Sequence, residues 1–411
     1  MMPRVYVTGM GAISAIGHNV AEAFQSLCDE WSGIGTMQYL HSQHASMPVG
    51  EVSLTDAELG AMTGLPDTTG LTRTTLLSII AAKEAIRDAG ITISEANGIR
   101  TGFISATTTG GMREFERYFH ELQDPKAVGD FNQYADTLDS ADHTEKVAAI
   151  LDIHDYISTV STACSSSSNA IILGAQLIKH GHLDRVICGG ADALCKFTIN
   201  GFKILMILDS EPCRPFDQTR KGINLGEAAA YLVLESEALA RDGRVIWGEL
   251  TGYSNTNDAF HQTASSPNGD GALLSMQQAI MMAGLSSSDI NYINAHGTAT
   301  ENNDLAEGMA IQRLFGTQPP LFSSTKAYTG HTLAAAGSLE AVFSLLAIAH
   351  DRFYTNLNFK NKMEELEIEP IAESISKMVD IDFDPIENVL SNSFGFGGTN
   401  TSLLFSKVKD A

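Results

Sequence analysis

The sequence places a cysteine directly before a helix-forming run of small residues. Cys164 ends the segment STAC and is followed by residues rich in Ala, Ile, Leu and Gly. A cysteine in the first turn of a helix has its thiolate stabilised by the unpaired backbone N–H groups and the helix dipole. Such a thiolate attacks thioesters at neutral pH. An ordinary buried cysteine is the alternative interpretation.

Two histidines and a lysine also lie in turns of small and polar residues. His296 is in NAHGTAT, directly after an apolar strand, where a side chain can face a ligand at the edge of a sheet. His331 follows KAYTG, which begins at Lys326, and starts a helix of very small residues. A His and a Lys leading into a buried helix need partners or a function, and Glu340 on the same helix is the acidic candidate. The alternative is a pair of capping or loop histidines.

The C-terminal segment NSFGFGGTN combines aromatic residues with glycines. Glycines allow backbone N–H groups to approach a ligand closely, and a Phe side chain such as that of Phe396 can gate a channel. A tight turn with two core Phe residues is the alternative.

Composition excludes several classes of function. The 26 basic and 49 acidic residues give a net charge of −23, which argues against nucleic acid and anionic membranes as partners. No charge-free apolar stretch is long enough to span a membrane, and the N-terminus is typical of a strand entering a Gly-rich turn. The five cysteines form no CxxC pair, which favours free thiols over disulfides or a zinc site. We therefore expect a cytoplasmic protein.

Strands and helices alternate along the chain, which predicts an α/β protein with a buried sheet. A weak repeat accompanies this order: AAKEAIRDAG leads to the strand of TGFISATTTGG, and MQQAIMMAG leads to that of INYINAHGTAT. A second echo relates residues 160–178 to residues 323–342, both Ser/Thr-rich turns that run into small-residue helices. The repeat indicates a duplication with the active site at the junction of the halves. Chance similarity of helix–strand units is the alternative.

The segments TACSS, NAHGTAT, STKAYTGHTLAAAGSLE and NSFGFGGTN together resemble the β-ketoacyl-acyl-carrier-protein synthase family, of the elongating Cys-His-His type in the thiolase superfamily. Residues 213–235, the opening VTGMGAISAIG and NDAFHQTASSP also match, so the resemblance covers essentially the whole chain in order. It implies a thiolase fold, a duplicated α-β-α-β-α five-layer architecture that is usually dimeric. We expect an N-terminal half at 1–245 that carries the cysteine and a C-terminal half at 246–411 that carries the two histidines.

The resemblance implies a decarboxylative Claisen condensation. Cys164 takes an acyl chain from an acyl carrier protein, malonyl-carrier protein loses carbon dioxide, and the resulting enolate attacks the bound acyl group. His296 and His331 should donate N–H hydrogen bonds to the malonyl thioester oxygen. The backbone N–H groups of Cys164 and Phe396 should form the oxyanion hole.

Other residues receive supporting roles from the same resemblance. Lys326 belongs to the catalytic set and, paired with Glu340, should orient His331. Thr298 and Thr300 match positions that bind the phosphopantetheine arm, and Phe396 is the expected gate. No metal or bound cofactor is needed, because the pantetheine arrives on the carrier protein.

Departures from the family pattern bear on the substrate. Four serines, Ser165 to Ser168, follow the nucleophile, as in polyketide ketosynthases. The loop from Thr107 to Met112 occupies the acyl-pocket region, where Thr109 and Met112 would line the pocket with Phe396. Because threonines are polar, we expect a conjugated or aryl-bearing chain and an aryl-polyene or other type II polyketide pathway. Ordinary fatty-acid elongation is the alternative.

The expected partners are acyl-ACP, malonyl-ACP and a second subunit, in a homodimer or in a heterodimer with a ketosynthase-like chain. Carrier proteins in such systems are acidic, so the docking surface should be basic. The candidate docking charges form a thin set, which leaves either a small local patch or a contribution from the partner subunit: Arg73, Lys126, Lys203 and Arg214.

Three competing interpretations share the fold. A chain-length factor would bind acyl chains without catalysis, but it usually lacks the nucleophile. A degradative thiolase uses a second cysteine near the C-terminus, and a starter-type synthase replaces one His with Asn; neither departure is present here. A purely structural role leaves the Cys-His-His-Lys set unexplained.

Overall fold

The computed structural model describes residues 3–93, 98–240, 244–372 and 385–408. Its main sheet has ten strands in the order β10-β9-β11-β12-β8-β1-β7-β6-β4-β5, and β2 and β3 form a separate small pair. The strands are β1 (Val5–Ser14), β2 (Gly35–Thr36), β3 (Pro48–Val49), β4 (Thr101–Ala106), β5 (Tyr156–Val160), β6 (Arg185–Asp192), β7 (Ala228–Ser236), β8 (Gly248–Asn257), β9 (Tyr292–Asn294), β10 (Leu321–Ser323), β11 (Asn388–Gly395) and β12 (Thr399–Ser406).

The ten strands fall into two sets of five with the same order and directions. The set β5-β4-β6-β7-β1 corresponds strand by strand, in chain order, to β10-β9-β11-β12-β8. In each set the first three strands are parallel and the next two pairings are antiparallel. The sets are joined by a short β1–β8 contact, in which Tyr6 pairs with Glu249 and Val7 with Gly248. The predicted duplication is therefore confirmed, while the boundary at residue 245 stays a prediction.

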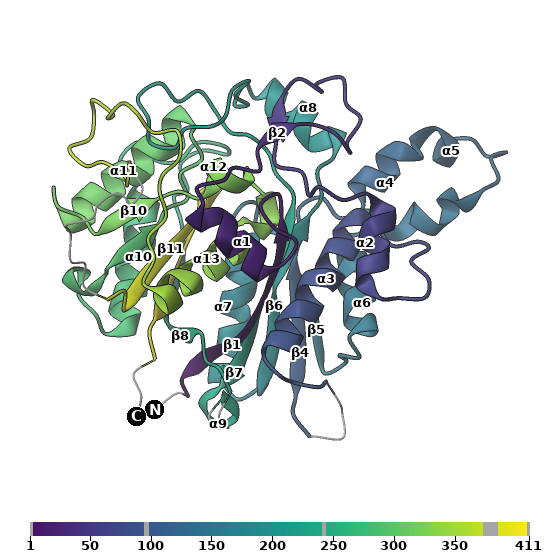
Figure 1. Cartoon of the computed structure of the whole chain (residues 1–411), viewed down its shortest axis with the longest axis horizontal. Helices are drawn as coiled ribbons and strands as arrows, with labels where there is room; N and C mark the ends of the chain where they lie inside the picture. The colour runs from purple at the N-terminus through teal and green to yellow at the C-terminus, as the bar shows by residue number, and fades with distance from the viewer. Residues whose placement is uncertain (1–2, 94–97, 241–243, 373–384, 409–411) are drawn as a thin grey trace.

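Helices complete five layers (Figure 1). α3 and α6 cover the outer face of the N-terminal sheet, α7 and α13 fill the space between the sheets, and α10 and α11 lie outside the C-terminal sheet. This is the α-β-α-β-α arrangement that the resemblance implied. The helices are α1 (Val20–Cys28), α2 (Asp56–Thr63), α3 (Arg73–Asp88), α4 (Met112–Arg117), α5 (Phe119–Gln123), α6 (Ser140–Ile150), α7 (Ser166–Lys179), α8 (Lys196–Ile204), α9 (Glu237–Ala240), α10 (Asp270–Ala283), α11 (Glu301–Phe315), α12 (Lys326–Thr329) and α13 (Ala336–His350).

Both predicted echoes correspond to equivalent elements. The first is α3 leading to β4 and α10 leading to β9, and the second is β5 leading to α7 and β10 leading to α13. Small residues allow α7 and α13 to pack closely at the centre, since a Cβ added to Gly337 would lie 2.0 Å from Ser168 Oγ. Leu333–His350 is apolar and long enough to cross a membrane, but 89% of this segment is buried in the protein, which marks it as a core helix.

Candidate active site

Cys164, His296 and His331 converge although they are far apart in the sequence. Cys164 follows β5, His296 follows β9, and His331 follows β10 and α12, so each side chain lies beyond the carboxyl end of a parallel strand. The Cys164 sulfur and one ring nitrogen of each histidine lie within 4.8 Å of one another, and all three residues are buried. These three residues meet at the junction of the two halves, where the active site was expected.

Cys164 is held in a strained turn. Ala163, the residue before it, has a φ of +52°, in the left-handed region that non-glycine residues rarely adopt. The Cys164 sulfur lies 3.0 Å from His331 Nε2 and accepts a hydrogen bond from the backbone N–H of Phe396. Burial raises the pKa of the Cys164 thiol to about 11, against the lowering effects of the Lys326 charge and the Phe396 N–H. The predicted thiolate, stabilised by the helix N-terminus, stays a prediction, and burial opposes ionisation of the thiol at rest.

His331 is fixed in one tautomer by the backbone. Its own N–H donates to the carbonyl oxygen of Asn224 at 2.7 Å, which holds the main chain in place. The N–H of Leu333 donates to His331 Nδ1 at 3.2 Å, so the ring hydrogen is on Nε2 and points toward Cys164. Burial, followed by the positive charge of Lys326, lowers the pKa of His331 well below its usual range. The ring is a neutral hydrogen-bond donor.

His296 reaches the same state through a side chain. Lys326 Nζ lies 3.2 Å from His296 Nδ1 and forms an ion pair with Glu340. With Nδ1 accepting from the ammonium, the ring hydrogen is on Nε2. Burial and then the Lys326 charge lower the pKa of His296 well below its usual range. The expectation that Lys326 and Glu340 orient His331 is wrong: the ammonium contacts His296, and a backbone N–H orients His331.

Two acidic residues on α11 shape the loop that carries His296. Glu307 accepts the backbone N–H groups of His296 at 2.9 Å and Gly297 at 2.8 Å, and Asp304 accepts those of Ala299 and Phe216. Burial raises the pKa of Glu307 to about 7. Sequence reasoning missed both residues, although their i, i+3 spacing places them on one face of a helix next to the motif.

A cavity of about 370 Å³ opens onto the three reactive groups. Aromatic, aliphatic and polar side chains all contribute to its wall. The lining residues are Cys164, Phe202, Leu205, Met206, Ile207, Lys221, Ile223, Thr263, Ser265, His296, Thr298, Thr300, Glu301, Asn302, Asn303, His331, Phe394, Gly395 and Phe396.

The structure places the predicted pantetheine residues in this cavity. Thr298 and Thr300 both line it, and their hydroxyl oxygens lie 2.9 Å apart. Thr300 also caps α11 by accepting the N–H of Asn303. Both hydroxyls can meet a polar arm that enters toward Cys164.

The acyl-pocket role predicted for Thr109 and Met112 stays a prediction. Neither residue lines the described cavity at Cys164. The hydroxyls of Thr107, Thr108 and Thr109 donate to the buried carboxylate of Asp192, at 2.6, 2.5 and 2.8 Å. These threonines therefore satisfy the hydrogen-bonding capacity of a buried acid, while Thr108 is itself exposed and Thr109 half-buried. Sequence reasoning did not identify Asp192.

Phe396 lies at the tip of the β11–β12 hairpin, between the nucleophile and α8. Its ring stacks on that of Phe202, with centroids 5.7 Å apart and planes inclined by 18°. Gly397 and Gly398 have φ values of +85° and +76°, which shows why this turn requires glycines. Phe396 thus offers a backbone donor to Cys164 and a ring to the cavity, and Phe202 is a partner that sequence reasoning missed.

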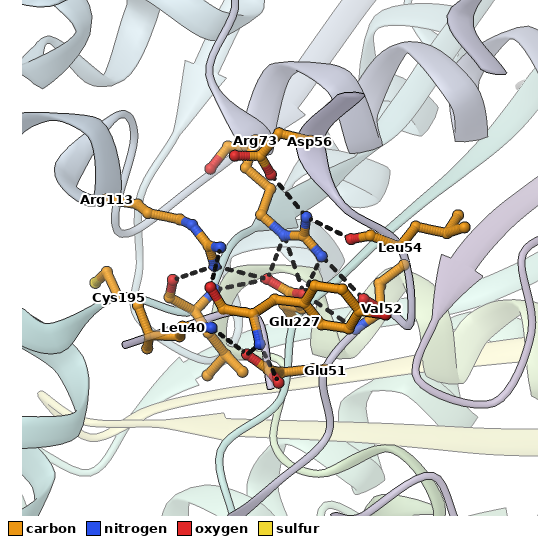
Figure 2. A network of polar contacts seen from close by, with 12 residues as sticks. Leu40, Glu51, Val52, Leu54, Asp56, Arg73, Arg113, Cys195 and Glu227 are labelled. Carbon is orange, nitrogen blue, oxygen red and sulfur yellow. Dashed lines mark hydrogen bonds and ion pairs between the residues drawn. The ribbon is translucent and has the colours of Figure 1, made fainter. Parts of the chain in front are cut away.

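Arg73 is not a docking residue. Figure 2 shows its guanidinium enclosed by Glu227, Asp56 and the carbonyl oxygens of Val52 and Leu54. The side chain is fully buried, and its carboxylate partners account for its charge.

The other proposed docking charges differ among themselves. Arg214 pairs with Asp209 and Glu211, so its charge is also compensated. Lys126 and Lys203 remain exposed. Of the four candidate docking charges, only these two lysines are therefore exposed.

The three reactive groups also have the spacing of a metal site. A Cys-His-His set suits a soft divalent ion. However, the ammonium of Lys326, 3.2 Å from His296 Nδ1, adds a positive charge next to the place that a cation would occupy. This charge fits an anionic oxygen better than a metal ion.

Comparisons with known proteins agree with this geometry. Family models match at residues 2–240, described as beta-ketoacyl synthase, N-terminal domain, and at residues 247–360, described as beta-ketoacyl synthase, C-terminal domain. A 3-oxoacyl-[acyl-carrier-protein] synthase 2 from Synechocystis sp. is 34% identical over 99% of this chain and 98% of its own.

Solved structures are similar over the full length. The ishigamide ketosynthase/chain length factor superposes with a TM-score of 0.90 at 30% identity and covers 100% of both chains. A chain of the complex of the ketosynthase ApeO with its chain length factor ApeC from Xenorhabdus doucetiae gives a TM-score of 0.82 at 31% identity, covering 99% of this chain and 98% of that one.

Proposed function

The chain belongs to the beta-ketoacyl synthase family and is an acyltransferase, and on this premise we propose that it condenses malonyl-ACP with an acyl chain bound to Cys164. The observation that carries the proposal is the pairing of one buried thiol with two neutral histidines whose Nε2–H groups face the same cavity. The condensation needs a thiol that can carry the acyl group and hydrogen-bond donors that can stabilise the enolate oxygen. Cys164 supplies the thiol, and the two histidines supply the donors.

In the first half-reaction Cys164 exchanges with the thiol of the pantetheine arm. The sulfur attacks the acyl carbonyl, the bond to the pantetheine sulfur breaks, and the thiol proton passes to the departing sulfur. The Phe396 N–H, which points at the Cys164 sulfur, lies close to the developing oxyanion. Because one thiol replaces another, a permanently ionised Cys164 is not required.

In the second half-reaction malonyl-ACP loses carbon dioxide and forms a carbon–carbon bond. Breakage of the C–CO2 bond leaves an electron pair that becomes an enolate, and its oxygen accepts the Nε2–H groups of His296 and His331. The enolate carbon attacks the acyl carbonyl, and the Cys164 sulfur leaves and regains a proton. Lys326 keeps His296 in the donating tautomer and places a positive charge near the enolate.

The reaction as proposed needs no metal and no resident cofactor. The histidines and Lys326 supply the electrostatic stabilisation that a Lewis acid would otherwise provide. Elemental analysis of active protein would test this: stoichiometric zinc whose removal abolishes condensation would contradict it.

We also propose that the substrate chains are those of a type II polyketide pathway, of the aryl-polyene or a related kind. The support is the full-length similarity to chains of two solved structures that each contain a ketosynthase and a chain length factor. The threonines of residues 107–109 are weaker support, since their hydroxyls donate to Asp192. Fatty-acid elongation is the second candidate, favoured by the 34% identity to a 3-oxoacyl-[acyl-carrier-protein] synthase 2.

Product analysis tests both proposals. The protein is mixed with malonyl-ACP and with acyl-ACPs that bear octanoyl, hexadecanoyl or polyenoyl chains, and the β-ketoacyl-ACP products are measured by mass spectrometry. Condensation with any chain supports the reaction. Faster turnover of polyenoyl chains supports the polyketide pathway, and equal or faster turnover of saturated chains contradicts it.

A further inference from the structure

An exposed apolar surface lies on the outer face of α8 and just beyond its end. Phe197, Ile204 and Met206 are 63%, 80% and 86% exposed. Phe197, Gly201 and Ile204 are spaced i, i+4, i+7 and share one helix face. A Cβ added at Gly201 would meet no atom within 4 Å, so this face is open. We call Phe197, Gly201, Ile204 and Met206 the α8 patch.

The α8 patch is continuous with the mouth of the active-site cavity. Leu205 and Met206 are exposed and also line the cavity. On the opposite side of the same helix, Phe202 enters the cavity and stacks on Phe396. One short helix therefore presents an apolar outer face and supports the Phe396 ring beside the nucleophile.

The patch belongs to an anchored helix. The carboxylate of Glu116 on α4 accepts the backbone N–H groups of Lys196 and Phe197, which caps the first turn of α8. Thr198 and Ile199 are buried on the inner side. Large exposed apolar side chains on a fixed helix indicate a binding surface.

The exposed charges around the patch are few. Lys203 and Lys221 are the exposed bases near the cavity mouth, Lys196 at the start of α8 is half-buried, and Glu301 is an exposed acid of the cavity lining. Glu211 and Arg214 compensate each other, and Arg214 also pairs with Asp209. A few bases therefore flank a patch that is itself strongly apolar.

We propose that the α8 patch is the surface on which the acyl carrier protein docks, through apolar contact more than through basic charges. The inference rests on the proposed function, because a substrate that enters on a tethered arm brings the body of its carrier onto the rim of the cavity. The carrier therefore presents apolar side chains beside its arm. Few charged contacts are needed, which agrees with the chain's net charge of −23.

The test is the double variant Phe197→Ser, Ile204→Ser, since neither side chain lines the cavity. KM and kcat are measured for an octanoyl chain on the carrier protein and for the same chain on N-acetylcysteamine. We expect KM for the carrier substrate to rise about tenfold or more, with kcat and the small thioester kinetics unchanged. Leu274→Ser, Met281→Ser on α10 is the matched control, because both side chains are exposed and apolar on the outer helix layer.

Salt and charge reversal separate apolar from electrostatic docking. We expect KM for the carrier to stay constant or fall as salt is raised, and Lys203→Glu to change it less than twofold. An unchanged KM in the double variant, a steep rise of KM with salt, or an equal loss with the small thioester would overturn the inference.

Two further outcomes distinguish failure of the docking inference from failure of the proposed function. If the double variant sediments at a lower mass than the wild type, the patch is a subunit contact and the inference falls. If the wild type fails to react with either form of the acyl chain, the proposed function itself fails. If only the docking inference fails, the wild type still reacts with the acyl chain on the carrier protein and on N-acetylcysteamine.

Discussion

At the scale of single residues, the surroundings of Cys164 disfavour its anion until a substrate arrives. Burial raises the pKa of the thiol to about 11, and the groups that oppose this effect are the Lys326 charge and the Phe396 N–H. The same donors, together with His331 Nε2–H, can stabilise an oxyanion. The site therefore stabilises a negatively charged oxygen that forms during the reaction better than it stabilises a thiolate in the free enzyme.

Alkylation measures the state of the thiol. We expect the rate of Cys164 alkylation by iodoacetamide to rise about tenfold per pH unit between pH 7 and pH 10, since only the thiolate reacts. The modified residue is identified by peptide mass spectrometry. A rate that levels off below pH 8 would show that the helix N-terminus outweighs burial.

Lys326→Met should separate the two half-reactions. Loss of the ammonium frees His296 Nδ1 and lets the ring adopt the wrong tautomer, so malonyl decarboxylation should fall about 100-fold. Acyl loading should fall much less, because His331, which contacts the sulfur, is oriented by Leu333. Carbon dioxide release and intact-mass loading are the two measurements, with Lys203→Met as an exposed control. Equal losses in both would indicate that Lys326 acts through His331.

The pH dependence of decarboxylation tests the neutral histidines. The pKa values of His296 and His331 lie well below the usual range, so both rings stay neutral as the pH falls from 8 to 6. We expect no loss of decarboxylation that follows an ionisation near pH 6.5. An acid limb with that midpoint, absent in His296→Asn, would contradict the assignment.

The reactive group could be found from the sequence, but its contacts could not. Cys164, His296, His331 and Lys326 stand out because each is a chemically unusual residue in a loop of small residues. Which histidine Lys326 touches depends on side-chain direction, which spacing along the chain does not encode. Arg73 was misjudged for the same reason, since Glu227 lies 154 residues away in the sequence.

At the scale of elements, close contact between α7 and α13 sets the position of the site. α7 begins just after Cys164, and α13 carries Glu340. Ser168 Oγ donates to Ser393 Oγ, which links α7 to β11 beneath the Phe396 turn. The small residues at this contact fix how the two halves meet.

Gly337→Ala tests this contact. The added Cβ would lie 2.0 Å from Ser168 Oγ and 2.8 Å from Ser393 Oγ, so we expect a loss of about 1–3 kcal/mol in the free energy of unfolding. Urea unfolding gives the measurement, and Gly201→Ala, with open space around the added atom, is the control. Gly337→Ala that unfolds like the control would show that the contact is not tight.

The elements themselves could be predicted in part. Strands with continuous apolar runs, such as β4, β6 and β7, are evident in the sequence, and so is the repeat. β8 and β12 are less evident, because Asn, Ser and Thr interrupt their apolar pattern where they approach the site. Polar residues there serve the junction of the halves, which local periodicity cannot reveal.

At the scale of the whole molecule, the two edges of the sheet differ. β10 ends one edge, where the Ile371 N–H donates to the Phe322 carbonyl oxygen and covers it. β5 ends the other edge and leaves Ile157 39% exposed. An edge strand that pairs on one side only with the described strands, and that carries an exposed apolar residue, favours pairing with another chain. Because Cys164 follows β5, a subunit bound there would lie close to the active site.

Ile157→Lys tests the role of this edge. A lysine on an edge strand opposes strand pairing, so we expect the variant to sediment as a monomer where the wild type sediments as a dimer. Val245→Lys, at an exposed apolar residue outside the sheet, is the control. A variant that remains dimeric would place the interface elsewhere, and a wild type that is monomeric alone would exclude the homodimer.

The most direct test of the central claim is the intact mass of the wild type and of Cys164→Ala after incubation with acyl-ACP. We predict a mass increase equal to one acyl group on the wild type and none on the variant. The added mass should disappear when malonyl-ACP is supplied, with release of β-ketoacyl-ACP. Acylation of the Cys164→Ala variant, or a wild type that loads no chain from any acyl-ACP, would contradict the account.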